Sequence, residues 1–431
     1  MPAFEYASSV LGSIPPHFRC ARFSQFRSFA IYLSFLARER GPKTGTSGAE
    51  SSFCVGKAPF SVVLLRIRRL FETPVFPHPM KMFPLFAVPA RIALLIPLLA
   101  IGPIAPVSAA PSTTLAISIR TLSSPYQVMY KVGAEAYAKQ VGLPLDVLTT
   151  EANSQKGLTD LKAEVARTGG NVAFYIDPND AADAVPIAKT LDAAGVYFVT
   201  WWSKPADVKV WDYPHWIAHI SFDGVAAGTY TATELFKTFK TPGHGKIIAL
   251  QGRLGDTPNA ERWQGLQQVL SQNPGVQLVQ WESALWDRTK AYNSTKAMLV
   301  AHPDIDGVWT ANDDMAMGAI QALKEAGLSG KVLVTGCDGI PEMFDAIKGG
   351  LAAATIFNDG KYQAQLGLAM SLAAKQGKLD VKSLPHERRQ FEIPAVNVNH
   401  ENVNQVVHDY IENTPTYDLS DFFAKWSKAI P

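Results

Sequence analysis

Polar, charged and aromatic side chains follow directly after a series of short apolar runs in this sequence. Trp201 and Trp202 come at the end of one run, and Asn312 and Asp338 each follow another. Forked guanidinium groups, amides and carboxylates pair with adjacent hydroxyls, while flat aromatic faces cover the apolar side of a ring. This chemistry indicates a neutral polyhydroxylated ligand, and a sugar is expected. The candidate site residues are Arg120, Ser124, Tyr126, Trp201, Trp202, Arg262, Trp286, Asn312, Asp338 and Asn358.

Several of these positions also allow a purely structural interpretation. Asp313 stands at a strand–helix junction and is typical of a helix N-cap, whereas the neighbouring Asn312 fits either role. Asp338 fits a cap or a turn as well as a site. Trp201 and Trp286, taken singly, fit a buried core equally well. The site prediction therefore depends on the group rather than on any one residue.

Sequence motifs for catalysis, cofactor binding or metal binding are not found. The chain has no GxGxxG after its first strand and no GxxxxGK[ST], GxSxG or HExxH. His215 and His219 flank a strand-like run, where their i, i+4 spacing does not bring metal ligands together. Arg288 is interpreted as the partner of a local acid and Cys337 as a small buried hydrophobe. We therefore expect a binding protein rather than an enzyme, with no cofactor and no metal.

Composition and charge exclude several classes of protein. The 431 residues are 47% hydrophobic and 18% charged, which allows two or three domains with real cores. Residues 111–431 carry 28 Lys and Arg against 34 Asp and Glu, a net charge of about −6, which argues against nucleic-acid binding. Three cysteines cannot build a disulfide framework.

The elements that must position these side chains alternate along the chain. Segments with helical spacing separate the apolar runs, which predicts parallel sheets with helices on both faces and ligand binding beyond the carboxyl ends of the strands. The runs lie at 114–119, 145–148, 171–176, 196–201, 246–250, 276–281, 307–310 and 332–335.

The expected fold class is α/β, with two doubly wound domains joined by a multi-strand hinge. A break is expected near the irregular stretch 203–214. The first lobe is predicted to comprise 111–220 with 359–391, and the second lobe 221–358 with 392–431.

Residues 80–110 have the pattern of a cleaved secretory signal peptide. Lys81 and Arg91 precede the apolar run 92–101, and small residues follow up to Ala110. An uncleaved membrane anchor is the alternative, disfavoured by the prolines in the run. The tract 1–79 precedes this signal and is interpreted as a non-native upstream extension or a disordered segment, with translation expected to start at Met80 or Met82.

The order of several short motifs resembles a known family. The most specific are NDDMAMGA at 312–319 and GCDG at 336–339, accompanied by SPY at 124–126, IDPND at 176–180 and LQG at 250–252. In this order they resemble the periplasmic sugar-binding proteins of ABC importers, in the ribose-binding-like group, over about 114–393. The resemblance implies the type I periplasmic-binding-protein fold. It also implies ligand contacts at Ser124, Tyr126, Arg262, Trp286, Asn312, Asp338 and Asn358.

The sequence departs from the family pattern at three places. Trp202 and Ser203 stand where the family has an Asp-Arg pair, Arg120 replaces a small polar residue, and Gln127 replaces a second aromatic. These departures remove one carboxylate–guanidinium pair and add bulk. We therefore expect the class of ligand to be kept rather than ribose itself.

The resemblance implies a monomeric periplasmic receptor that captures a sugar between two lobes and delivers it to an inner-membrane permease. The alternative is an extracytoplasmic sensor that presents bound sugar to a chemoreceptor or a histidine kinase. A ligand-sensing domain of a lac-repressor-type regulator shares this fold, but a signal peptide occupies the place of its DNA-binding helices. A hydrolase or isomerase is the third option.

Overall fold

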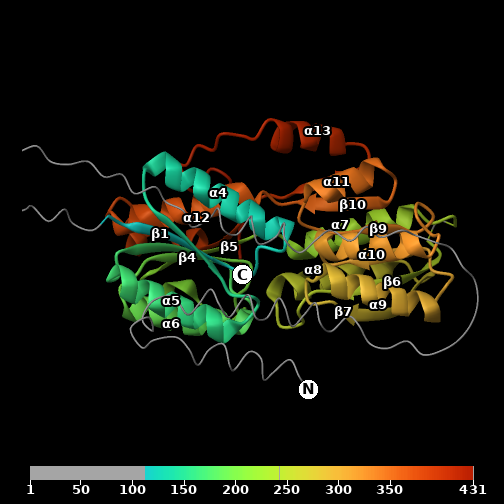
Figure 1. Cartoon of the computed structure of the whole chain (residues 1–431), viewed down its shortest axis with the longest axis horizontal. Helices are drawn as coiled ribbons and strands as arrows, with labels where there is room; N and C mark the ends of the chain where they lie inside the picture. Colours follow the sequence, from blue (N-terminus) through green and yellow to red (C-terminus); the bar gives the residue numbers. More distant parts are fainter. Residues whose placement is uncertain (1–111, 242, 431) are drawn as a thin grey trace, which may run out of the picture. The chain divides into compact units, whose positions relative to one another are not determined.

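The chain folds into two mainly parallel sheets, each covered by helices on both faces (Figure 1). The computed structural model describes residues 112–241 and 243–430. The expected signal peptide at 80–110 and the upstream tract 1–79 lie outside the described residues. In the described part of the chain, no helix has both the length and the apolarity to cross a membrane. The expected α/β class with two doubly wound domains is confirmed.

The first sheet has seven strands in the order β13-β11-β5-β4-β3-β1-β2. Strands β1 and β3 are buried along their whole length. They are continuous apolar runs because helices cover both faces of the sheet. The strands are β1 (Thr114–Ile119), β2 (Leu145–Thr149), β3 (Val172–Ile176), β4 (Phe198–Trp201), β5 (Trp216–Ser221), β11 (Gln390–Glu392) and β13 (Lys428–Ala429).

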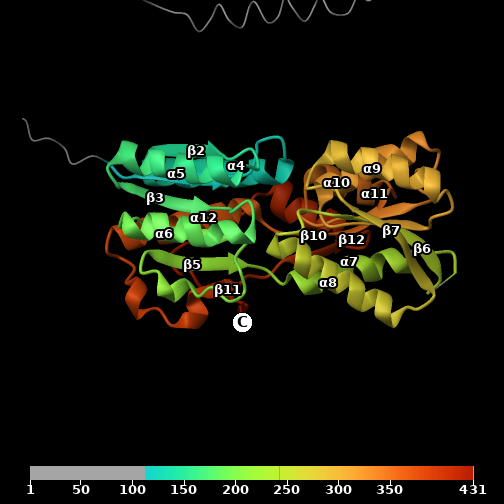
Figure 2. The ribbon, with the colours of Figure 1, turned by 90° about the horizontal axis from the view of Figure 1, so that it is seen from below.

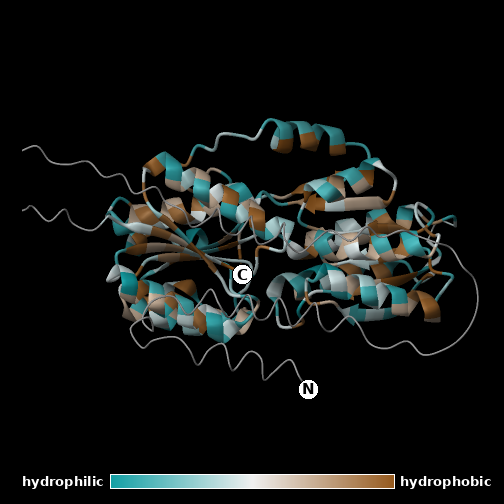
Figure 3. Ribbon diagram, viewed as in Figure 1, coloured by the Kyte–Doolittle hydropathy of each residue, from teal (hydrophilic) through white to brown (hydrophobic). Residues whose placement is uncertain are grey.

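Four helices cover the first sheet, and together with it they form the first lobe. Helices α4 (Pro125–Val141) and α12 (Gly360–Lys375) pack together on one face, and α5 (Ser154–Thr168) and α6 (Ala184–Ala193) cover the other (Figure 1). The core lies between these layers, where hydrophobic residues run along the strands (Figure 3).

The second sheet has six strands in the order β12-β10-β9-β8-β6-β7. Figure 2 shows helices α7 and α8 on one side of it and α9, α10 and α11 on the other, and these elements form the second lobe. The strands are β6 (Gly245–Gln251), β7 (Val276–Ser283), β8 (Gly307–Thr310), β9 (Leu333–Thr335), β10 (Ala352–Phe357) and β12 (Val396–Asn399). The helices are α7 (Gly224–Lys237), α8 (Thr257–Gln272), α9 (Arg288–Ala301), α10 (Asp313–Glu325), α11 (Pro341–Lys348) and α13 (Val403–Val407).

Short segments carry the chain between the two sheets. Residues 222–223 lead from β5 to α7, residues 358–359 lead from β10 to α12, and residues 393–395 lead from β11 to β12. These three crossings agree with the expectation that several short connections, rather than one tether, join the lobes.

Two expected boundaries are wrong. The irregular stretch 203–214 lies between β4 and β5 of the same sheet, so the first crossing comes only after Ser221. The end of the chain was expected in the second lobe, but β13 pairs with β11 in an antiparallel manner, with Phe391 opposite Ala429. The chain therefore crosses a fourth time, after β12, and completes the first sheet. A strand of two residues has no periodicity from which to predict it.

Candidate functional site

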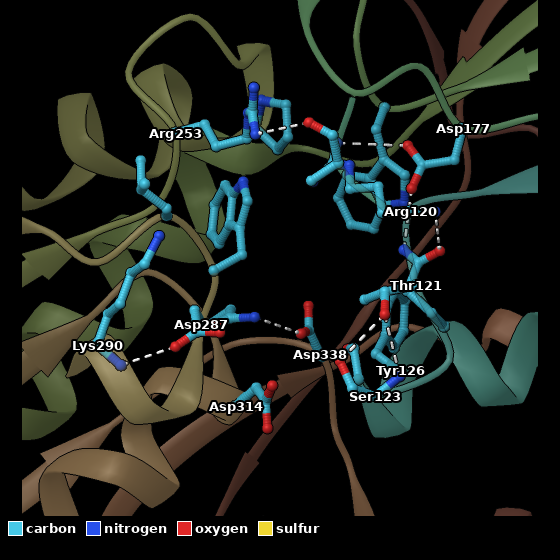
Figure 4. A pocket seen from close by; sticks show the side chains of 18 of the residues that line it. Arg120, Thr121, Ser123, Tyr126, Asp177, Arg253, Asp287, Lys290, Asp314 and Asp338 are labelled. Atoms are coloured by element: carbon cyan, nitrogen blue, oxygen red, sulfur yellow. Dashed lines mark hydrogen bonds and ion pairs between the residues drawn. The ribbon is translucent and has the colours of Figure 1, made fainter. Parts of the chain in front are cut away.

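A cleft of about 310 Å³ lies between the carboxyl ends of the strands of both sheets (Figure 4). This is the edge at which doubly wound sheets bind ligands. Eight of the ten predicted site residues line the cleft. They are Arg120, Ser124, Tyr126 and Trp202 from the first lobe, and Arg262, Trp286, Asn312 and Asp338 from the second.

Arg262 lies on α8 at the centre of the second lobe's wall. Helices α7 and α8 approach so closely that a Cβ on Gly228 would lie 2.0 Å from the Arg262 carbonyl oxygen. One Nη donates to the Ala311 carbonyl oxygen at 2.7 Å, and the same Nη lies 3.8 Å from an Asp338 oxygen. The guanidinium carbon lies 5.0, 5.4 and 5.6 Å from three ring centroids, those of Trp202, Phe222 and Trp286. These aromatic rings fix the cation, and its Nε–H has no hydrogen-bond partner among the residues that the structure describes.

Asp338 and Asn312 form the polar floor of the second lobe's half. Asn312 caps α10 by accepting from the Met315 N–H at 3.0 Å, and its Nδ2 donates to Asp338 Oδ2 at 3.3 Å. Asn312 therefore is the N-cap of α10 and also lines the cleft. Burial raises the pKa of Asp338 well above its usual range, and Arg262 opposes this effect.

Asp313 holds the neighbouring loop and not a ligand. It is fully buried, and its carboxylate accepts from the Gly339 and Ile340 N–H groups at 2.6 and 3.0 Å and from the Thr355 hydroxyl at 2.6 Å. The N-cap expected at Asp313 is instead formed by Asn312. Asp313 thus fixes the loop that carries Asp338.

The first lobe contributes a second buried ion pair. Arg120 Nη2 lies 3.4 Å from Asp177 Oδ1, and Gln127 Nε2 donates to the other Asp177 oxygen at 2.9 Å. Burial raises the pKa of Asp177 to about 6, although Arg120 acts in the opposite direction. Figure 4 shows Arg120 and Asp177 together on the wall of the cleft. The carboxylate–guanidinium pair that the sequence seemed to lack is therefore rebuilt from β1 and the end of β3.

Sequence reasoning missed Asp177 as a site residue. It lies in the IDPND motif directly after β3, so the rule that ligands bind beyond strand ends could have identified it. Arg253, Asp287, Lys290 and Asp314 also line the cleft (Figure 4).

Tyr126 and Trp202 are fixed by one buried hydrogen-bond network. The hydroxyls of Tyr126 and Tyr130 donate to Gln363 Oε1 at 3.1 and 2.6 Å, and Trp202 Nε1 donates to the Tyr130 hydroxyl at 2.5 Å. Gln363 Nε2 in turn donates to Asn358 Oδ1. Ser124, by contrast, makes no capping bond to α4, so its hydroxyl is free for a ligand.

Two predicted site residues do not line the cleft. Trp201 is fully buried in the first lobe's core beside Tyr175, so its structural interpretation is correct and its assignment to the site is wrong. Trp201 is the last residue of β4, whereas Trp202 follows the strand with a φ of +67°, and this turn of the backbone directs the Trp202 ring to the cleft. Asn358 lies behind the cleft, where it supports the tyrosine network through Gln363.

Trp286 is held in the cleft wall by a backbone conformation with positive φ, which is uncommon for residues other than glycine. Its φ is +65° and its indole fills the space over Gly252, where a Cβ would lie 2.2 Å from the ring. Its Nε1–H donates to Asp256 Oδ2 at 2.8 Å. A strained backbone of this kind persists only where the surroundings hold it, and it is common at ligand sites.

The remaining expectations concern residues outside the cleft. Arg288 pairs with Asp314 at 2.7 Å and with Glu342 at 2.5 Å, as its interpretation predicted. Cys337 is a buried free thiol. Among the residues that the structure describes, no three His, Cys, Asp or Glu side chains gather as a metal site would require. The cleft thus offers hydrogen bonds, charge and aromatic surface from two lobes.

Comparisons with known proteins agree with this architecture. Residues 115–379 match the periplasmic binding protein domain family. The ribose import binding protein of Salmonella typhimurium is 32% identical over 266 residues, which cover 62% of this chain and 86% of that protein.

Two solved structures share the fold. A twin-arginine translocation pathway signal protein from Burkholderia phytofirmans has a TM-score of 0.71 and 41% identity, covering 74% of this chain and 98% of that chain. An ABC transporter periplasmic solute-binding protein from Actinobacillus succinogenes, solved with bound D-allose, has a TM-score of 0.60 and 27% identity, covering 68% and 100%. The names of these relatives do not favour the sensor alternative.

Proposed function

Because this chain belongs to the periplasmic binding protein domain family, we propose that it captures one neutral sugar or sugar alcohol between its lobes and delivers it to the permease of an ABC importer. Its two parallel-sheet lobes have the type I fold of these proteins. Relatives whose names include ribose and D-allose support a sugar as the class of ligand.

The pairing of buried charges carries this proposal. Arg120 pairs with Asp177 inside the first lobe, and Arg262 lies beside Asp338 inside the second. Arg120 also lies 3.1 Å from Asp256 Oδ2 of the second lobe, so each of the two guanidiniums has at least one carboxylate beside it. In the described cleft, neither Arg120 nor Arg262 is therefore an unpaired cation that would attract an ionic ligand. The groups still offer donors and acceptors, and hydrogen bonds to charged groups are the strong ones. The hydroxyls of a neutral sugar can pair with both these donors and these acceptors.

The size of the cleft limits the ligand. A volume of about 310 Å³ is at the small end of ligand pockets and suits one monosaccharide-sized molecule. Arg120 and Trp202 add bulk to the first lobe's wall, so the preferred sugar differs from ribose.

Capture follows from closure of the lobes around the crossings at 222–223, 358–359 and 393–395. A sugar that contacts both walls binds the closed form more tightly than the open form, and this differential affinity shifts the population toward closure. The permease then recognises the closed shape. In this proposal the receptor is a periplasmic monomer, exported by the signal peptide at 80–110, and it does not transform its ligand.

A thermal-shift screen of the full chain tests the ligand class. The panel contains pentoses, hexoses, sugar alcohols, disaccharides and, as charged matches, the corresponding uronic acids. A ligand at one hundred times its dissociation constant adds about 2.7 kcal/mol to the free energy of unfolding. We expect a neutral monosaccharide or polyol to give the largest shift and to be recovered unchanged. A uronic acid as the only strong hit, or conversion of the bound sugar, contradicts the proposal.

A transport assay separates an importer from a sensor. Deleting the coding gene from the source organism should abolish uptake of the radiolabelled hit, and restoring the gene should recover it. Normal uptake combined with lost chemotaxis would favour the sensor.

A further inference from the structure

The loop that follows β6, residues 253–257, reaches across to the first lobe. The Ala181 N–H donates to the Gly255 carbonyl oxygen at 3.3 Å. The Thr257 hydroxyl donates to the Lys204 carbonyl oxygen at 3.0 Å and lies 3.4 Å from the Lys204 N–H. Gly255 is packed so tightly that a Cβ would lie 2.3 Å from an Asp180 oxygen. All of these are contacts between protein groups, so they form whenever the lobes are closed, with or without a ligand.

Asp256 is the charged centre of this loop. Its side chain is buried, and its Oδ1 accepts from the Ser203 hydroxyl at 2.5 Å. Its Oδ2 accepts from Trp286 Nε1 at 2.8 Å and lies 3.1 Å from Arg120 Nη2. Ser203 and Arg120 belong to the first lobe, whereas Trp286 belongs to the second.

The position of Asp256 connects closure to the ligand. Asp256 does not line the cleft, but its partners Arg120 and Trp286 do. Opening the lobes takes Asp256 away from Ser203 and Arg120, so a buried carboxylate loses two of its three donors. Opening exchanges these two contacts for hydrogen bonds to water, and because intramolecular bonds to charged groups are stabilising on balance, the exchange favours the closed arrangement.

We propose that residues 253–257 form a clasp that raises the closed population of the ligand-free protein, and that Asp256 is the positioning residue that joins this closure to Arg120 and Trp286. Closure in advance raises the apparent affinity for ligand, because the binding-competent state is already populated. The effect on affinity rests on the proposed function, whereas closure without ligand does not.

Amide exchange at Ala181 tests the clasp directly, because its hydrogen bond crosses between the lobes. In the ligand-free full chain we expect the Ala181 amide to exchange at least tenfold more slowly than in an unstructured peptide. The variant Asp256→Asn keeps the Oδ1 acceptor for Ser203 but loses the charge facing Arg120, so it should speed this exchange at least tenfold. Asp304→Asn, at an exposed ion pair with Lys246, is the matched control and should change nothing.

A second variant distinguishes loss of the clasp from a general folding defect. Ser203→Ala removes one donor of the clasp and no residue of the cleft, so it should speed exchange in the same direction by a smaller factor. Denaturant unfolding confirms that each variant is folded. Exchange at Ala181 as fast as in a peptide in the unmodified protein, or equal rates in the unmodified protein and both variants, overturns the proposal.

The dissociation rate of the sugar found by the screen is the second readout. Asp256→Asn should release it at least tenfold faster, and Asp304→Asn should leave the rate unchanged. If no sugar binds, the proposed function fails while the exchange experiment still decides the clasp. If a sugar binds and leaves all variants at the same rate, the coupling of Asp256 to the cleft is wrong.

Discussion

At the scale of single residues, the site combines buried charge with incomplete hydrogen bonding. Asp338 lies in a cleft where burial raises its pKa, and its φ of +145° is unfavourable for a residue with a side chain. Within the described part of the chain, Arg262 and Arg120 each have a buried Nε–H without a hydrogen-bond partner. Buried charges and unpaired donors of this kind lower the stability of the folded protein. Their presence in the cleft indicates that they serve ligand binding.

Asp338→Asn should therefore separate affinity from stability. Removing the charge relieves a burial penalty, so the ligand-free variant should unfold at the same temperature or a higher one. Sugar affinity should fall at least tenfold, because a hydrogen bond to a charged group contributes about 1.5–3 kcal/mol. Calorimetry of binding and of unfolding measures both quantities. A folded variant with unchanged affinity would remove Asp338 from the site.

Arg262→Ala should weaken binding at least tenfold for the same reason, since its guanidinium lines the cleft. Arg167→Ala is the matched control, because Arg167 is exposed and pairs with Glu164 far from the cleft. Titration calorimetry should give equal dissociation constants for the control and the unmodified protein. Equal constants for Arg262→Ala as well would show that the ligand does not reach α8.

The affinity should depend on pH through Asp177. Its pKa of about 6 lies above its ordinary value, so it gains a proton as pH falls through 6 and loses the charge that faces Arg120. If binding requires the ionised form, affinity is constant above pH 7 and is about tenfold lower at pH 5, where about a tenth of the carboxyls stay charged. Binding curves from pH 5 to 8 measure this change. A step that persists in Asp177→Asn belongs to another group.

At this scale the sequence predicted which side chains gather but not how each one is used. The rule that ligands bind beyond the carboxyl ends of parallel strands identified eight of the cleft residues. It succeeded because parallel strands bring their carboxyl ends to the same edge of the sheet. It could not separate Trp201 from Trp202, since Trp201 ends β4 in the core whereas Trp202 lies in the turn that follows, with a φ of +67°. It also could not show that Arg120 pairs with Asp177, because that contact joins residues 57 positions apart.

At the scale of elements, loops with strained backbone carry the aromatic walls of the cleft. Trp202 and Trp286 both have positive φ, at +67° and +65°. Each follows a strand of a different sheet, and each is tied by its indole nitrogen, to Tyr130 and to Asp256. Strand periodicity predicted eight of the thirteen strands of the described chain to within two residues. The predicted runs lack β5 and β10 to β13, and the turns depend on contacts between residues that are distant in the sequence.

Gly252→Ala should displace the Trp286 wall. The new Cβ would lie 2.2 Å from the indole, so the ring must move, and we expect a loss of about 1–3 kcal/mol in stability together with weaker binding. Gly377→Ala is the comparison, because its φ of +69° brings backbone strain while no atom lies within 4 Å. Urea unfolding and sugar titration should show lost affinity for the first variant only. Unchanged affinity in both would mean that Trp286 does not contact the ligand.

At the scale of the whole molecule, the first lobe is assembled from distant parts of the chain. Its sheet begins with β1 and is completed by β11, which follows five of the six strands of the second sheet, and by β13, which follows the entire second lobe. The returning segment is held by the Trp426 Nε1–H, which donates to the Glu387 carbonyl oxygen at 3.0 Å, and by the Phe423 ring against Phe391. The alternation of strands and helices predicted two lobes, but nothing local in the sequence predicted this return.

Deleting residues 414–431 should destabilise the first lobe. The deletion removes β13 and the aromatic packing on Phe391, so β11 becomes an exposed edge strand. We expect the midpoint of thermal unfolding to fall by more than about 5 °C, since each kcal/mol lost shifts it by roughly 2–4 °C in domains of this size. Lys428→Ala keeps β13 and removes the half-exposed ammonium that pairs with Asp223 and Glu392, so it should have little effect. Scanning calorimetry compares the three proteins, and equal midpoints would show that the return adds no stability.

The late return of the chain also fixes the order in which the protein can be completed during synthesis. Residues 114–221 leave the ribosome with five strands of the first sheet, yet β11, which lies beside β5, is made only after five of the six strands of the second sheet. Until residue 390 has emerged, the outer edge of β5 has no partner strand in the described chain. The second sheet is itself completed only by β12, which follows β11. A nascent chain in this state exposes an unpaired strand edge, the kind of edge at which separate chains pair and aggregate.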